Sequence, residues 1–227
     1  HPLHTTYLFI LALPQQTRMG VSSVHILPIN DGLSGPQMID TYTLQLEALG
    51  AKKSGQFSVE CDTYLSSPAI TTASSQKVLN LITASEYPAS AFSLIENGPT
   101  VVTDSSFEQI LTNLSNFYTP RKLARMEVRG QRWSLNDFVI KLGSCTMGPN
   151  FKAIVAEIEY GPCCVPSNCW ELIKELGQTF VGSSINSPHQ YLTVNARMNE
   201  VFSPVDTIHQ YNDIFNQLKK MTAQAAK

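Results

Sequence analysis

The segment MGPNFKAIVAEIEYGPCCVPSNCW, residues 147–170, decides the fold of this chain. In its centre, residues 152–160, successive side chains would point to opposite faces of a strand. Ile154, Ala156, Ile158 and Tyr160 share one face, and Ala153, Val155, Glu157 and Glu159 share the other. Alternation with a period of two predicts a strand whose sheet has one face on a core and one face partly in water. Gly161-Pro162 ends this strand, and Ser167 is the expected N-cap of the helix that follows.

Other segments with strand character extend this strand into a large sheet. They cover residues 21–28, 57–64, 78–83, 91–96, 100–103, 123–129 and 133–142. Short connections, including the hairpin dipeptide Asn97-Gly98, predict antiparallel pairing between neighbours in sequence. So many strands do not fit one flat sheet in a chain of 227 residues. The sequence therefore predicts an α+β fold, an antiparallel, open or near-closed β-barrel of about eight strands with flanking helices.

Helix-start signals place the expected helices around this sheet. Ser34 with Gln37, and Ser105 with Glu108, have the spacing of a capping box, and Pro204 has the position of a first-turn proline. We expect residues 19–227 to form a single domain. Residues 1–18 are expected to be an N-terminal extension outside it, unstructured or not native.

Composition limits the classes of function. The chain is 43% hydrophobic and 15% charged, with a formal net charge of −2, which leaves enough apolar surface for a core. Lys and Arg are scattered, unlike the clusters of proteins that bind nucleic acid or acidic membranes directly. We expect neither of these partners. The apolar run at residues 7–13 is too short to span a bilayer as a helix. This run is the one feature that suggests a secreted or membrane-anchored binding protein.

The five cysteines, Cys61, Cys145, Cys163, Cys164 and Cys169, do not form the even set of a disulfide framework. They favour a reducing compartment. Cys163, Cys164 and Cys169 were considered as zinc ligands, but the adjacent pair lacks the C-x-x-C spacing and no suitably spaced His follows. Buried apolar thiols are the preferred interpretation, and no metal or cofactor is expected.

Acidic and basic side chains on three neighbouring strands suggest one possible catalytic site. Glu157 and Glu159 share a strand face, and the other members are Arg125, Glu127, Arg129, Asp137 and Lys141. Paired glutamates could hold a divalent cation while the basic groups bind phosphates, as in a metal-dependent tunnel-type triphosphatase. The alternative is a set of cross-strand ion pairs on a solvated sheet face. The single E-x-E favours that alternative.

Trp133 offers a second candidate site, for protein binding. It lies beside Arg129 and Arg132, and Trp and Arg are enriched at the centres of interfaces. We therefore interpret Arg129, Arg132 and Trp133 as interface residues. The alternative, equally compatible with composition, is that Trp133 packs inside the protein.

The chain resembles the Mediator subunit 20 family of the transcriptional Mediator. The resemblance rests on the order and spacing of short motifs along almost the whole chain, of which Glu157–Cys163 (EIEYGPC) and Cys169-Trp170 are the most specific. The other motifs lie at residues 19–21, 46–51, 86–92, 96–99, 127–130, 137–138, 146–149, 204–207 and 210–211. Residues 1–18 fall outside the family pattern.

This resemblance implies a non-catalytic nuclear subunit of the Mediator head module, a transcription coactivator. It implies an open antiparallel barrel with flanking helices. The implied partners are Mediator subunit 18, itself a related barrel, and the C-terminal part of subunit 8, with RNA polymerase II engaged indirectly.

Overall fold

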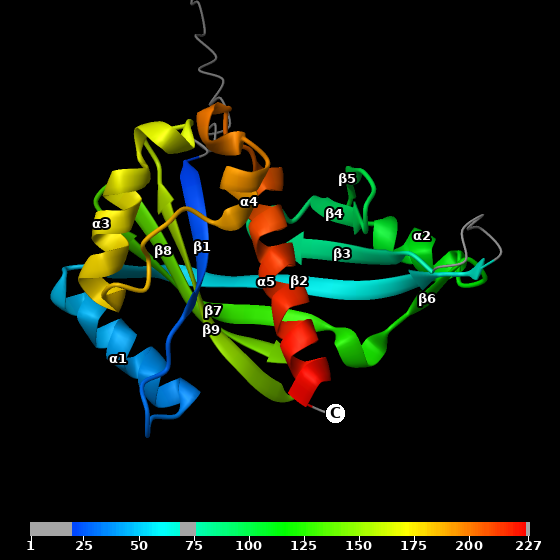
Figure 1. Ribbon diagram of the computed structural model, residues 1–227, viewed down its shortest axis with the longest axis horizontal. Coiled ribbons are helices and arrows are strands. Elements are labelled where there is room, and N and C mark those ends of the chain that lie inside the picture. The colour runs from blue at the N-terminus through cyan, green and yellow to red at the C-terminus, as the bar shows by residue number, and fades with distance from the viewer. Residues whose placement is uncertain (1–19, 69–75, 226–227) are drawn as a thin grey trace, which may run out of the picture.

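The computed structural model describes residues 20–68 and 76–225, and the expected extension at residues 1–18 lies outside this range. Most of the chain forms one curved sheet with helices packed against it (Figure 1). The described strands are β1 (Val21–Leu27), β2 (Lys52–Ser66), β3 (Val78–Ala84), β4 (Ser90–Ile95), β5 (Thr100–Asp104), β6 (Tyr118–Pro120), β7 (Met126–Leu135), β8 (Phe138–Met147) and β9 (Asn150–Tyr160). The described helices are α1 (Gly35–Ala48), α2 (Phe107–Asn113), α3 (Trp170–Val181), α4 (Gln190–Val194) and α5 (Pro204–Ala225), with single 3-10 turns at Lys122–Ala124, Pro166–Asn168 and Arg197–Asn199.

The sheet is antiparallel throughout, with the strand order β1-β9-β8-β7-β2-β3-β4-β5 and β6 paired to β2. This confirms the expected α+β class and antiparallel sheet. Within the described residues the end strands β1 and β5 do not pair with each other, so the sheet is open. Of the two forms expected, an open or a near-closed barrel, the structure has the open one.

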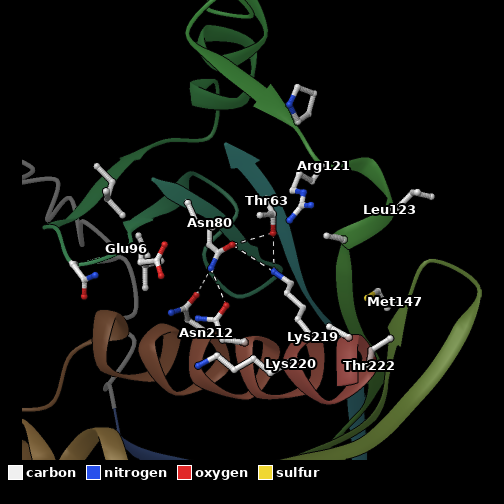
Figure 2. Close-up of a pocket in the computed structure, with 18 of the residues that line it drawn as sticks. Thr63, Asn80, Glu96, Arg121, Leu123, Met147, Asn212, Lys219, Lys220 and Thr222 are labelled. Carbon is white, nitrogen blue, oxygen red and sulfur yellow. Dashed lines mark hydrogen bonds between the residues drawn. The ribbon is translucent and has the colours of Figure 1, made fainter. Parts of the chain in front are cut away.

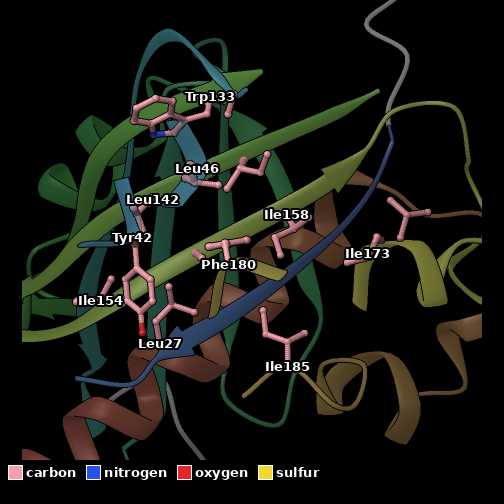
Figure 3. Packing of buried hydrophobic residues seen from close by; sticks show 14 of the residues in the cluster. Leu27, Tyr42, Leu46, Trp133, Leu142, Ile154, Ile158, Ile173, Phe180 and Ile185 are labelled. Carbon is pink, nitrogen blue, oxygen red and sulfur yellow. The ribbon is translucent and has the colours of Figure 1, made fainter. Parts of the chain in front are cut away.

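The two faces of the sheet carry different clusters of buried side chains, because residues alternate along each strand. On one face, α1 and α3 pack over β1, β9, β8 and β7 (Figure 3). The larger members of this cluster are Leu27, Tyr42, Leu46, Trp133, Leu142, Ile154, Ile158, Ile173 and Phe180. On the opposite face, α5 packs against a cluster that includes Val24, Phe57, Val59, Ile82, Phe92, Val128, Val155, Ile208, Tyr211 and Phe215.

The sheet was expected to have one face partly exposed to solvent, but helices pack against both faces. Residues 153–158 of β9 are buried without interruption, since α3 covers one face of this strand and α5 lies over the other (Figure 1). Glu157, on the α5 face, is only 3% exposed. The alternation of apolar and polar residues therefore predicted correctly on which face each side chain lies, but it did not predict which side chains are exposed to solvent.

The hairpin formed by β7 and β8 lies in a different place from the predicted one. Strands were expected at residues 123–129 and 133–142, with a turn near Gly130. One strand instead runs through Gly130, and the turn is at Asn136 and Asp137, where Asn136 has a positive φ of 50°. Gly130 pairs with Gly143 of β8 in a close backbone approach, so this glycine serves strand packing and not a turn.

Of the four expected helix starts, two are confirmed and two are wrong. The Ser34–Gln37 capping box is confirmed, and α5 begins at Pro204 as predicted. The predicted box at Ser105 is wrong: α2 has Ser106 as N-cap and no capping bond from a side chain. Ser167 is also not an N-cap, because it lies in a 3-10 turn and α3 begins at Trp170.

Candidate interaction surface

A buried cluster of charged side chains lies between β8, β9 and α5. Lys141 Nζ donates to Glu157 Oε1 at 2.8 Å and also to Glu86. Tyr211 Oη donates to Glu157 Oε2 at 2.8 Å. Lys141 and Glu157 are cross-strand partners, and each is 3% exposed. Both carboxylate oxygens of Glu157 are therefore bonded to protein side chains.

The electrostatics of this cluster are those of a closed ion-pair network. Burial alone would lower the pKa of Lys141, but the carboxylates of Glu157 and Glu86 outweigh burial and raise this pKa. The ammonium of Lys141 is therefore charged at neutral pH. Burial is also the main cause of the raised pKa of Glu159, which accepts a hydrogen bond from Gly20 N at 3.3 Å.

This network argues against the catalytic alternative and supports the preferred interpretation of cross-strand ion pairs, although the Lys141–Glu157 pair is buried and not solvated. Among the described residues, Glu86, Glu157 and Glu159 have carboxylate oxygens within 4.8 Å of one another, close enough to share a cation. The ammonium of Lys141, however, already forms ion pairs with Glu157 and Glu86, and Arg132 contacts Glu86 as well. The free space beside them is about 10 Å³, whereas pockets for small molecules measure about 300–1,000 Å³. The cluster therefore lacks room for a nucleotide.

The other members of the expected catalytic face lie elsewhere. Arg125 and Arg129 form ion pairs with Glu60, and the Arg129–Glu60 distance is 3.2 Å. Strand alternation places Arg129 and Glu127 on the side of the sheet opposite to Lys141. Asp137 lies in the β7–β8 turn and shares no strand face with Lys141. The structure thus separates the seven residues into a buried network, an exposed ladder and a turn.

The three expected interface residues are not brought together as one anchor. Trp133 is 1% exposed and belongs to the core cluster beneath α1, with Lys53 Nζ 5.1 Å from its ring centroid. The side chains of Arg129 and Arg132 are 67% and 40% exposed. They lie on opposite faces of β7, and Arg132 contacts Glu86 at 3.5 Å. The alternative of a packed Trp133 is the one that the structure shows.

The five cysteines are all free thiols. Cys61, Cys145 and Cys169 are buried, Cys163 is half-buried and Cys164 is exposed, so the expectation of buried thiols fails at Cys164. Burial raises the pKa of Cys145 and of Cys169 to about 12. In the described part of the chain, no group of potential metal ligands includes a cysteine.

A large groove, which we call the α5 groove, lies between α5, the strands β2, β3 and β4, and the turn at Lys122–Ala124 (Figure 2). Its volume is about 1130 Å³. Its charged lining side chains are Arg121, Lys122, Lys219, Lys220 and Glu96, and its apolar ones include Leu94, Ile95, Leu123 and Met147. Leu123 is 93% exposed.

A hydrogen-bond network forms the floor of the α5 groove (Figure 2). Lys219 Nζ donates to Thr63 Oγ1 at 2.7 Å and to Asn80 Oδ1 at 3.5 Å. Asn80 Nδ2 in turn donates to Asn212 Oδ1 at 2.8 Å and to Asn216 Oδ1 at 3.3 Å. The network holds α5 to β2 and β3 through polar contacts beside the apolar cluster.

Sequence reasoning missed this groove. The signal that could have found it is a second stripe on the last helix, since Asn212, Asn216 and Lys219 recur at helical spacing beside the apolar stripe of Tyr211, Phe215 and Leu218. Nothing in one sequence, however, shows that Arg121 and Leu123, almost a hundred residues earlier, face the same stripe. In the described residues, no helix has the length and apolar character needed to cross a membrane.

Comparison with solved structures gives only distant similarities. The PH1012 protein of Pyrococcus horikoshii OT3 has a TM-score of 0.42 and 14% sequence identity, covering 74% of this chain and all of that one. The Schizosaccharomyces pombe Mediator head module has a TM-score of 0.29 and 10% identity, covering 60% of this chain and 79% of that one.

Comparison of sequences is far more specific. A family described as the TATA-binding related factor (TRF) of subunit 20 of Mediator complex matches residues 19–216. The human protein named Mediator of RNA polymerase II transcription subunit 20 is 39% identical over 204 residues, covering 89% of this chain and 95% of that protein. The Anopheles gambiae protein of the same name is 40% identical over 215 residues, with 90% and 96% coverage. The chain therefore belongs to the Mediator subunit 20 family.

Proposed function

We propose that this protein is a non-catalytic subunit of the Mediator head module that acts in the nucleus as a coactivator of transcription by RNA polymerase II. In this proposal it pairs with Mediator subunit 18, is joined to the head through subunit 8 and contacts the polymerase only indirectly. The observation that carries the proposal is the sequence similarity to Mediator subunit 20 proteins over almost the full length of both chains.

The buried charged cluster around Lys141 supports a role in binding rather than catalysis. Glu86 and Glu157, two of the three clustered carboxylates, form ion pairs with Lys141, and the free space beside them is about 10 Å³. A triphosphatase would need these carboxylates to face a solvated channel wide enough for a nucleotide. The metal-dependent triphosphatase is therefore not favoured.

Arg129 and Arg132 remain the proposed contacts with subunit 18, because the side chains of both are partly exposed and Arg is common at interface centres. Trp133 is left out of this proposal because its side chain is buried. The opposite faces that the two arginines occupy predict that at most one of them lies near the centre of the contact.

Co-expression of the chain with subunit 18 of the same species, followed by size-exclusion chromatography and a binding titration, tests the proposal. We expect an equimolar complex. We expect one of the two variants, Arg129→Ala or Arg132→Ala, to weaken this complex by about tenfold and the other to have a smaller effect. Lys52→Ala, an exposed cation near the start of β2, is the matched control and should bind as the wild type does. A chain that elutes separately from subunit 18 contradicts the pairing, and a complex that tolerates both Arg variants contradicts the assignment of the contacts.

A further inference from the structure

We propose that the α5 groove binds a segment of another protein that carries carboxylate side chains beside apolar ones. This proposal goes beyond the pairing with subunit 18 and does not depend on it. It rests on the charge, the hydrogen-bonding direction and the shape of the groove.

The lining of the groove carries more positive than negative charge. Arg121, Lys122, Lys219 and Lys220 line it against one acidic side chain, Glu96. In the described parts of the chain, none of these four cations forms an ion pair. This contrasts with Lys141, Arg125 and Arg129, each of which contacts a carboxylate.

Lys219 makes the shortage of negative charge most explicit. Its ammonium is half-buried and is held by a hydroxyl, an amide oxygen and the sulfur of Cys61 at 3.7 Å. These groups are neutral acceptors, and a partly desolvated cation is more stable when a carboxylate joins it. The geometry of this site therefore favours an anionic group that arrives from outside the chain.

The hydrogen bonds of the groove floor determine which amide atoms donate and which accept. Lys219 can only donate, so the Oδ1 atom of Asn80 faces it, and Asn80 Nδ2 faces α5. Asn212 and Asn216 must then accept through their oxygens, which leaves their Nδ2 groups without a hydrogen-bond partner among the described residues. Cations and amide donors together select an occupant rich in oxygen acceptors.

The apolar lining separates a peptide from a phosphate polyanion. Leu123 is almost fully exposed at the edge of the groove, and Leu94, Ile95 and Met147 lie in the same lining. Apolar side chains at the mouth, together with the carboxylate of Glu96, disfavour a ligand that is charged along its whole length. A protein segment with both acidic and apolar side chains satisfies both parts of the groove. The volume of about 1130 Å³ accommodates several such side chains.

Fluorescence anisotropy with the full chain tests this proposal. The probe is a labelled synthetic peptide in which aspartate and glutamate alternate with leucine and phenylalanine, and the comparison peptide has lysine in place of each acidic residue. We expect saturable binding of the acidic peptide, weakening with added salt because the contact is partly ionic. The lysine peptide should not bind.

Variants at the rim locate the binding without disturbing the fold. Leu123→Asp and Lys220→Glu change exposed side chains of the groove, and each should weaken binding by about tenfold. Val194→Asp and Lys52→Glu make the same changes at exposed positions outside the groove lining and should bind as the wild type does. Thermal melting of each variant verifies that it is folded.

Three results would overturn the proposal. The first is no saturable binding of the acidic peptide to the wild-type chain. The second is equal loss of binding in the groove variants and their controls, or no loss in either. The third is binding of sodium tripolyphosphate or of a single-stranded oligonucleotide with no binding of the peptide, which would identify the groove as a site for phosphate polyanions.

Discussion

Lys141 is the residue on which the polar part of the core depends most. It is buried between two carboxylates, and removal of one partner from a buried ion pair leaves the other charge uncompensated. We expect Lys141→Met to lower the free energy of unfolding by about 3–5 kcal/mol. Chemical denaturation measures this loss.

Two further variants separate this ionic effect from a general loss of packing. Adding Glu157→Gln to Lys141→Met should restore part of the lost stability, because glutamine keeps an acceptor for Tyr211 and removes the buried charge. Lys174→Met breaks the Lys174–Glu171 pair at the surface and should cost under about 1 kcal/mol. A double variant less stable than Lys141→Met alone contradicts the ionic explanation.

His25 predicts a pH dependence of stability. Burial, with a smaller contribution from His189, lowers the pKa of His25 from 6.5 to about 4, and its Nε2 lies 2.8 Å from Ser23 Oγ. Between these two pKa values the unfolded chain binds a proton that the folded protein does not bind. Stability should therefore fall as the pH drops through this window, by about 2 kcal/mol for His25 between about pH 7 and pH 5.

The variant His25→Gln tests this dependence, since glutamine offers a polar nitrogen near the position of Nε2 and does not titrate. Urea unfolding at both pH values should show a smaller loss for the variant than for the wild type. Part of the loss should stay, because burial lowers the pKa of His189 to about 4 as well. An identical pH dependence in the variant and the wild type would exclude His25 as its source.

At the scale of the elements, the paired glycines of β7 and β8 decide the path of the hairpin. A Cβ atom on Gly130 would lie 2.0 Å from the carbonyl oxygen of Leu142, and one on Gly143 would lie 2.4 Å from that of Arg129. Both contacts are with backbone, which cannot rotate away. The close approach of the two strands therefore requires glycine at both positions.

Gly130→Ala should consequently destabilise the protein by about 2 kcal/mol or more. Gly32→Ala is the control. Gly32 has a φ of +85°, but an added Cβ atom there would meet no atom within 4 Å, so the loss of stability should come from backbone strain alone, about 1 kcal/mol. Melting temperatures of the two variants test the difference. A Gly130 variant at least as stable as the Gly32 variant would show that the strands can separate without cost.

The same hairpin shows what sequence could and could not predict at this scale. Period-two alternation identified β9 and most of the other strands, because a buried strand shows its alternation locally. The turn was misplaced because glycine marks both turns and close strand contacts, and only the partner Gly143 distinguishes the two. The correct signal was Asn136-Asp137, since Asn tolerates the left-handed conformation that this turn requires.

For the molecule as a whole, sequence predicted the sheet and its flanking helices, but not which side chains of the sheet the helices cover. The helix α5 lies across one face and closes over Glu157, and no local pattern shows that a helix so far along the chain covers that carboxylate (Figure 1). The ion pairs around Lys141 are buried because α5 covers them, whereas those around Arg129 lie on the opposite side of the sheet and are exposed. The acidic and basic residues considered for a catalytic site do not form one cluster, because they lie on both faces of the sheet and in a turn.

We propose that this chain functions as a protein-binding subunit of Mediator. Purification of the tagged full chain from nuclear extract, followed by quantitative mass spectrometry of the proteins that stay bound after a salt wash, tests this role. We expect Mediator subunits 18 and 8 in amounts equimolar with the chain. Recovery of the chain free of Mediator subunits would show that it is not part of the complex.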